Sequence, residues 1–124
     1  MDSILNSIKK LLGITDDYVC FDTDIMLHIN SALSVLTQIG VGPETGFTIE
    51  DANATWNDFI PDDPRLGMVK TYVFLKVKLA FDPPTSSGVL TSYVQMAKEY
   101  EWRLQVATDP PVVPELGGEN QNGV

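Results

Sequence analysis

The chain has 124 residues, of which 44% are apolar and 20% charged, the composition of one ordinary globular domain. Seventeen acidic residues against eight basic ones give a net charge of −9, which argues against a broad phosphate-binding surface and against adsorption to an anionic membrane. No apolar run approaches the roughly 20 residues of a membrane helix, and the N-terminus lacks a signal-peptide pattern, so we expect a soluble intracellular protein.

Residues 2–12 are predicted to form a short amphipathic helix. Their apolar side chains recur at the i, i+3 and i+4 spacing of one helix face. Asp2 or Ser3 is suited to cap the start of this helix, because either side chain can accept a hydrogen bond from a free backbone N–H. Lys9, in the last turn, is placed to interact favourably with the C-terminal end of the helix dipole.

Residues 23–39 are predicted to form a longer helix with a continuous apolar stripe. Asp22 and Thr23 are suitable N-cap residues. Gly40 and Gly42, followed by a proline, predict that the helix ends there.

The segment 41–60 lacks helical periodicity and is rich in Gly, Pro, Thr, Asn and Asp. Residues 47–49 are predicted to form a short strand. Residues 54–60 are predicted to form a helical turn whose Trp56 and Phe59 fill part of the core.

Residues 64–81 are predicted to form a helix with Asp63 as its N-cap and Pro64 in its first position. From Met68 onward this helix is apolar nearly all round, so more than one of its sides must be covered. Two interpretations remain open. The helix is either the buried centre of the bundle, with its lysine stems reaching solvent, or it also packs on a neighbouring subunit.

Residues 87–106 are predicted to form the last helix, capped by Ser86 or Ser87. The expected apolar stripe consists of Leu90, Tyr93, Ala97, Tyr100 and Leu104, widened by Val89, Val94 and Met96. The expected solvent face carries Lys98, Glu99, Glu101 and Arg103. The chain after Thr108 is rich in Pro, Gly and Asn, and it is either a solvated end or an extended docking arm.

The predicted fold class is therefore all-α. We expect a bundle of four to five helices with a short irregular or β-like segment at 41–60 and an extended C-terminal arm. Residues 1–107 are expected to form the helical domain and residues 108–124 the arm.

The sequence contains no recognisable catalytic or metal-binding constellation. A single histidine, His28, cannot form a histidine-based metal site, and the acidic clusters do not have the spacing of a calcium loop. Cys20 lies between apolar neighbours and is expected to be a buried, inert thiol, and one cysteine excludes a disulfide within the chain. Gly40-Val41-Gly42 lacks the remaining residues of a phosphate-binding loop. We therefore predict a protein without enzymatic activity, metal or cofactor.

The order and spacing of several segments resemble the small head–tail connector (adaptor) proteins of tailed bacteriophages. The resemblance covers residues 1–106, and no part of it is a catalytic signature. The segments that carry it are Ile4–Gly13 followed by Ile14-Thr15-Asp16-Asp17, then His28-Ile29-Asn30, Gly40-Val41-Gly42-Pro43, Trp56-Asn57-Asp58-Phe59, Val69-Lys70-Thr71-Tyr72, Leu79-Ala80-Phe81-Asp82-Pro83-Pro84 and Glu101-Trp102-Arg103-Leu104.

This resemblance implies a mainly helical virion protein of the phage neck, made in the host bacterial cytoplasm. About twelve copies would form a closed ring under the portal protein, with heterologous contacts between neighbours. The ring would extend the DNA channel and offer a platform to the next connector, stopper or tail protein. DNA would pass through the lumen without specific binding, which fits the acidic balance of the chain.

Charge suggests which residues would join neighbouring subunits. Residues 41–63 carry six acids and no base, whereas residues 64–81 carry four bases and no acid. We expect the bases to meet acids of a neighbouring copy. The residues expected at this interface are Arg65, Lys70, Lys76 and Lys78 on one side and Glu44, Glu50, Asp51 and Asp58 on the other. The residues expected to dock on the portal are Pro110, Pro111, Val112, Val113, Pro114 and Leu116.

Two other functional classes remain open. The chain could be a small regulatory protein-binding module whose C-terminal tail is the recognition segment. An accessory subunit of an enzyme is the third hypothesis. Ring formation in the presence of portal assemblies distinguishes the connector from both.

Overall fold

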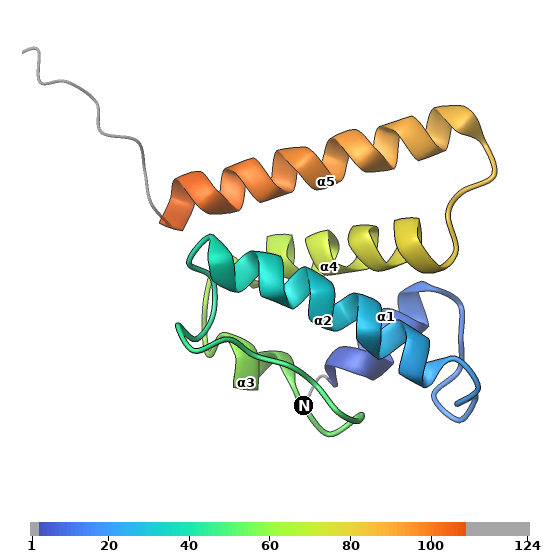
Figure 1. The fold of residues 1–124 in the computed structure, drawn as a ribbon, viewed down its shortest axis with the longest axis horizontal. Helices are drawn as coiled ribbons and strands as arrows, with labels where there is room; N and C mark the ends of the chain where they lie inside the picture. The colour runs from blue at the N-terminus through green and yellow to red at the C-terminus, as the bar shows by residue number, and fades with distance from the viewer. Residues whose placement is uncertain (1–2, 109–124) are drawn as a thin grey trace, which may run out of the picture.

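A computed structural model describes residues 3–108, and in this part of the chain it is an all-helical bundle (Figure 1). The predicted fold class is confirmed. The helices are α1 (Ile4–Leu11), α2 (Asp22–Gln38), α3 (Trp56–Phe59), α4 (Leu66–Phe81) and α5 (Ser87–Thr108). Among these residues no strand is present, and no helix is long and apolar enough to cross a membrane.

The start of α1 follows the sequence prediction, whereas the start of α2 does not. Ser3 caps α1 by accepting a hydrogen bond of 3.2 Å from the backbone N–H of Asn6. Phe21 is the N-cap of α2 and makes no side-chain cap, so the expectation of a cap at Asp22 or Thr23 was wrong. Asp22 lies inside the first turn, where its carboxylate faces Lys9 of α1 at 2.8 Å.

The predicted strand at 47–49 is absent because a side chain takes the place of a neighbouring strand. The carboxamide of Asn30 on α2 accepts a hydrogen bond of 2.8 Å from the backbone N–H of Ile49. The same carboxamide donates one of 3.0 Å to the carbonyl of Ile49. These two bonds satisfy the backbone of Ile49 while its side chain is buried. The segment therefore has no need of a strand partner.

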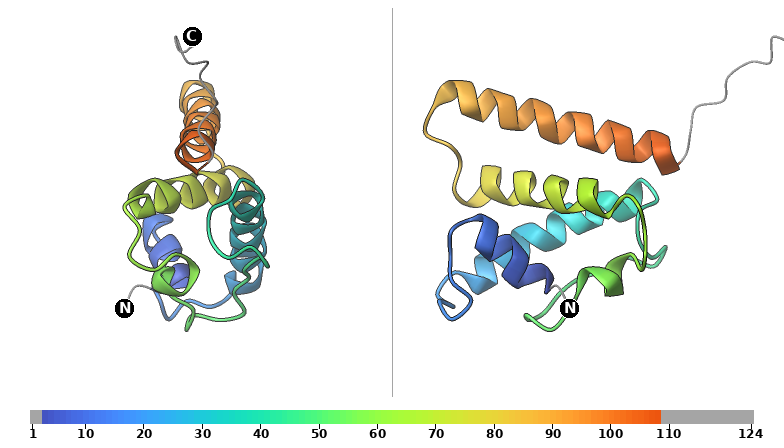
Figure 2. Two further views of the ribbon diagram at one scale, coloured as in Figure 1. Left: turned by 90° about the vertical axis from the view of Figure 1, so that its left-hand side faces the viewer. Right: turned by 180° about the vertical axis from the view of Figure 1, so that it is seen from behind.

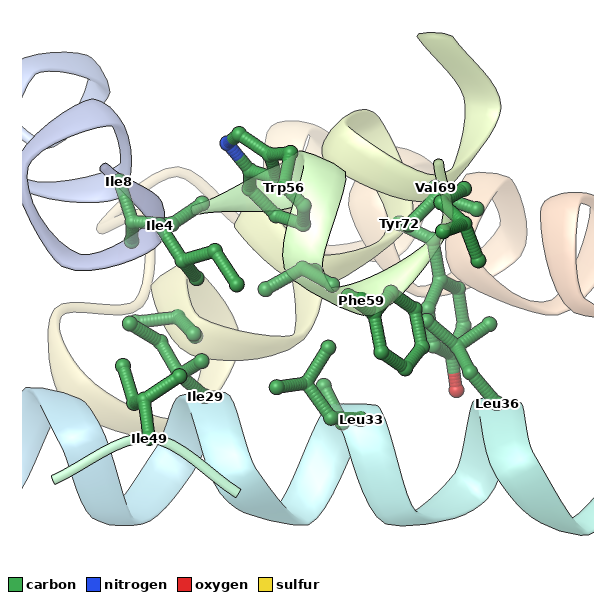
Figure 3. Close-up of a cluster of buried hydrophobic side chains, with 14 of the residues drawn as sticks. Ile4, Ile8, Ile29, Leu33, Leu36, Ile49, Trp56, Phe59, Val69 and Tyr72 are labelled. Carbon is green, nitrogen blue, oxygen red and sulfur yellow. The ribbon is translucent and has the colours of Figure 1, made fainter. Parts of the chain in front are cut away.

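The predicted helical turn at 54–60 is confirmed as α3. Thr55 and Asp58 form a capping box, in which each side chain accepts a hydrogen bond from the other's backbone N–H. Trp56 and Phe59 are buried, and Figure 3 shows both rings pointing into the cluster formed with α1, α2 and α4. The indole N–H of Trp56 donates to the hydroxyl of Ser7 at 2.8 Å, which ties α3 to α1.

Helix α4 is the central helix of the bundle. It begins at Leu66, two residues later than predicted, because the carboxylate of Asp63 accepts a hydrogen bond from the N–H of Arg65 in the preceding turn. Helices α1 and α2 pack on one side of α4, and α5 packs on the other. Every large apolar side chain of α4 is at least half-buried. Within the subunit α4 is therefore the buried centre of the bundle.

Candidate functional site

The most exposed element of the described fold is α5. It extends two residues beyond its predicted end and rests on α4, as both views in Figure 2 show. Ala97 and Leu104 are its only buried residues. Between the two helices, the hydroxyl of Tyr72 donates a hydrogen bond of 2.8 Å to the carboxylate of Glu101. The expectation that Glu101 belongs to the solvent face was therefore wrong.

Both flanks of α5 carry uncovered apolar side chains. Successive residues of a helix are about 100° apart, which places Val94 and Met96 on opposite sides of the contact with α4. The exposed apolar residues of α5 are Val89, Leu90, Val94, Met96 and Trp102. Trp102 is 63% exposed. The predicted stripe is thus only partly buried, because a single helix covers only its centre.

Exposed apolar side chains also occur in and near the connection between α1 and α2. They are Tyr18, Val19 and Phe21 in the connection, Leu11 at the end of α1 and Leu27 in α2. The ring of Phe21 lies edge-on to Tyr18 and to Phe81 at the end of α4, with centroid distances of 5.7 and 5.3 Å. Cys20, within the same connection, is exposed, so the expectation of a buried thiol was wrong. Its apolar neighbours are themselves turned outward, and apolar sequence neighbours alone do not bury a residue.

The four basic residues expected at a subunit interface do not share one face. Arg65 is paired with Asp63, and Lys78 with Asp82 at 2.9 Å. Lys70 lies 6.0 Å above the ring of Trp56, and Lys76 is half-buried. At about 100° per residue these side chains point in different directions around α4. The structure does not bring them together as one stripe.

The acids expected opposite these bases lie on the segment between α2 and α4. Glu44, Glu50 and Asp51 are exposed, and Asp51 accepts a hydrogen bond from the N–H of Asn53 at 2.8 Å. Asp58 is exposed as well, but its carboxylate belongs to the capping box of α3. Of these four acids, Asp58 therefore caps a helix, and Glu44, Glu50 and Asp51 do not.

The ion pair between Asp63 and Arg65 defines the end of the molecule where α5 finishes. Arg65 donates from Nη2 to one carboxylate oxygen of Asp63 at 2.6 Å and from Nε to the other at 3.0 Å. This hydrogen-bonded guanidinium lowers the pKa of Asp63, and the carboxylate raises the pKa of Arg65 in return. The Nη1 of Arg65 also donates to the hydroxyl of Thr108. The expected portal-docking residues 110–116 lie outside the described residues.

A shallow pocket lies beside this ion pair. Its volume is about 360 Å³, and its walls include Gly42, Pro43, Phe59, Pro61 and Arg65.

No group of three or more metal-ligating side chains occurs within residues 3–108, and His28 is half-buried. The exposed flanks of α5 and this pocket are the features that sequence reasoning missed. The sequence contained a signal for the exposed flanks, because the apolar pattern of residues 87–106 is too wide to be covered by a single neighbouring helix.

Comparison with known protein families gave a match. Residues 4–111, which contain all the helices described above, match the family described as Phage connector protein. No curated protein and no solved structure gave a match.

Proposed function

Because this chain belongs to the phage connector protein family, whose members are structural proteins of the virion, we propose that it forms a ring on the portal and joins the capsid to the tail. The observation that carries this proposal is the family match over residues 4–111. In the proposed assembly about twelve copies close into a ring in the neck, as cyclic heterologous contacts permit. The ring extends the DNA channel and presents a platform to the next connector, stopper or tail protein.

The exposed apolar surfaces support this proposal. A ring with heterologous contacts requires two different surfaces on each copy. Helix α5 and the connection between α1 and α2 lie on opposite sides of α4 (Figures 1 and 2), and both carry exposed apolar side chains. Exposed apolar patches mark interaction sites more often than plain surface does, and these side chains are the candidates for such patches. A neighbouring copy that covers α5 accounts for its incomplete burial.

Charge provides the second part of the proposed interface. The bases Lys70 and Lys76 would face acids of the neighbouring copy from different directions around α4. Arg65 and Lys78 would do so while they also pair with acids of their own subunit. The acids in this pairing are Glu44, Glu50, Asp51 and Asp58. Such pairs guide association and fix register more than they add affinity. The net charge of −9 favours a lumen that DNA passes without specific binding.

Residues Pro110–Leu116 form the proposed docking arm toward the portal. An extended segment of prolines and β-branched residues loses little conformational entropy on binding and presents its backbone and apolar side chains to a partner. Deletion of residues 109–124 is expected to leave a folded, ring-competent subunit that no longer binds portals. Portal binding at the wild-type level by the deleted chain would remove the arm from the mechanism.

The experiment that tests the proposal is mass photometry with negative-stain imaging of the chain alone and mixed with portal assemblies. We expect rings, or portals lengthened by an added collar. A chain that stays monomeric and ignores portals would contradict the proposal. That outcome would favour the alternative, a small regulatory binding module with a C-terminal recognition tail.

A further inference from the structure

We propose that the pocket beside the Asp63–Arg65 ion pair holds the proline-rich segment of the same chain, Pro110–Val113. The pocket lies where α5 ends, and the segment begins two residues after Thr108. This contact concerns the free subunit and does not depend on the proposed function.

Two contacts hold Thr108, the residue from which the segment continues, next to the pocket. Arg65, a pocket residue, donates a hydrogen bond to the hydroxyl of Thr108. Gly40, another pocket residue, meets the methyl group of Thr108 so closely that a Cβ at position 40 would lie 2.5 Å from it. An extended chain advances about 3.4 Å per residue, so Val113 lies within roughly 17 Å of Thr108. The segment therefore reaches the whole pocket without any rearrangement of α5.

The walls of the pocket suit a proline-rich segment. Pro43, Pro61 and Phe59 contribute apolar rings to its lining. Gly42 makes this arrangement possible, because a Cβ there would lie within 2.4 Å of the Phe59 ring. The polar residues at the pocket are largely satisfied, since Arg65 and Asp63 neutralise each other. Segments with the extended proline conformation bind to grooves lined by aromatic and apolar rings.

Because the segment is joined to the subunit next to the pocket, a weak intrinsic affinity is enough to keep the pocket occupied. A segment joined to its site by two residues has an effective concentration of about millimolar or more. An intrinsic dissociation constant near 1 mM would then keep the pocket occupied for about half of the time or longer. Where the proposed function holds, this contact competes with the portal for the same arm, and portal binding would first have to release it.

The test uses the full chain with a photo-crosslinker, Val113→p-benzoylphenylalanine, in the absence of any portal. We expect crosslinks to residues 40–43 and 58–65, mapped by mass spectrometry. A mixture of ¹⁴N- and ¹⁵N-labelled chains distinguishes contacts within a chain from contacts between chains. The crosslinker at Asn122 is the positional control and is expected to give no preference for the pocket.

A matched pair of variants tests the pocket itself. Pro61→Glu places a charge on the exposed wall and is expected to reduce the Val113 crosslink at least fivefold. Asn57→Glu adds the same charge at an exposed position on α3 outside the pocket lining and is expected to leave the crosslink unchanged. Crosslinks that join different chains, that fall elsewhere, or that survive Pro61→Glu would overturn the proposal. None of these outcomes depends on ring formation or portal binding.

Discussion

Lys9 shows at the scale of one residue how a charged side chain organises the start of the fold. Its side chain is fully buried at the junction of α1 and α2. The Nζ donates to the carbonyl of Asp16 at 3.1 Å and approaches Asp22 Oδ1 at 2.8 Å, off the direction of a hydrogen bond. A sequence-based interpretation places Lys9 at the helix dipole, because nothing in the pattern shows which way the chain turns after Gly13. The partner that buries Lys9 lies thirteen residues away.

Replacement of this buried cation is expected to be costly. Lys9→Met leaves the Asp22 carboxylate, which is 22% exposed, without its partner, so we expect a loss of about 3 kcal/mol in the free energy of unfolding. The double variant Lys9→Met/Asp22→Asn removes both charges and is expected to recover at least half of this loss. Urea denaturation measures both, with exposed Lys10→Met as the control, expected within about 0.5 kcal/mol of wild type. A double variant no more stable than Lys9→Met would contradict the ion-pair explanation.

Tyr72 links the central helix to α5 and gives the stability a dependence on alkaline pH. Burial, together with the hydrogen bond to Glu101, raises the pKa of Tyr72 well above its ordinary value of 10.0. The folded state therefore holds this proton more tightly than the unfolded state. The resulting stabilisation is complete below about pH 10 and declines as the pH rises further.

We expect Tyr72→Phe to lower the free energy of unfolding at pH 7 by about 1–2 kcal/mol and to flatten its decline above pH 10. Amide hydrogen exchange in α5 is expected to accelerate more than in α2, because the lost bond joins α4 to α5. Tyr93→Phe is the control, since its hydroxyl makes no hydrogen bond within residues 3–108. The same alkaline profile in Tyr72→Phe and wild type would refute this assignment.

At the scale of the element, the sequence predicts helices better than it predicts which of them are covered. The caps at Ser3 and Thr55 and the proline-bounded end of α4 depend on local chemistry, and the predicted elements agree with them. The strand at 47–49 was wrong because Asn30, nineteen residues away, binds the backbone of Ile49. Local β-propensity contains no information about such a partner.

Helices α4 and α5 also show that the sequence does not predict which apolar side chains the fold leaves exposed. The apolar pattern of α4 suggested a surplus surface, but α1, α2 and α5 cover it. The exposed apolar side chains lie instead on α5, whose widened stripe was expected to be buried. The composition of a helix does not show which other helices will cover it, and this decides which apolar helix lies at the centre. The sequence thus indicated that apolar surface would be left over, and within the subunit this surface is exposed on α5.

If α5 is a subunit contact, a charge on either flank is expected to prevent ring assembly without unfolding the subunit. Val94→Asp and Met96→Glu each place a carboxylate on one of the exposed flanks, where each wild-type side chain is less than half exposed. We expect each variant to raise the concentration for half-maximal ring formation at least tenfold and to change thermal stability little. Gln95→Glu, between them in sequence and exposed, is the control. Normal rings from both flank variants would exclude α5 as the contact.

At the scale of the whole molecule, opposite charges occupy different segments, and this asymmetry suits a heterologous ring. The acids of 41–63 lie mainly on the segment between α2 and α4, whereas the bases of 64–81 lie on or next to α4. Two of the bases, Arg65 and Lys78, are engaged with acids of their own subunit. Lys76 is therefore the base best suited to test a contact between copies. Lys70, whose ammonium lies 6.0 Å above the Trp56 ring, is reversed together with it because both are expected at the interface.

Reversal of these charges is the prediction that tests the assembly as a whole. Exposed ion pairs contribute about 0.2–1 kcal/mol each, and reversal adds repulsion, so two pairs amount to about 1.4 kcal/mol per contact. We expect Lys70→Glu/Lys76→Glu to raise the concentration for half-maximal ring formation about tenfold, measured by mass photometry at low salt. The effect is expected to diminish at 0.5 M salt, where exposed charges are screened.

A compensating variant separates charge pairing from local damage to the subunit. Adding Glu50→Lys and Asp51→Lys to the reversed chain exchanges the signs on both sides of the proposed contact, so rings are expected to return toward the wild-type concentration. Lys10→Glu, at an exposed position on α1, is the control for a single charge reversal away from the proposed contact. If the fourfold variant assembles no better than the reversed one while both remain folded by circular dichroism, these acids are not the partners of the α4 bases. Ring closure would then depend on the apolar flanks of α5.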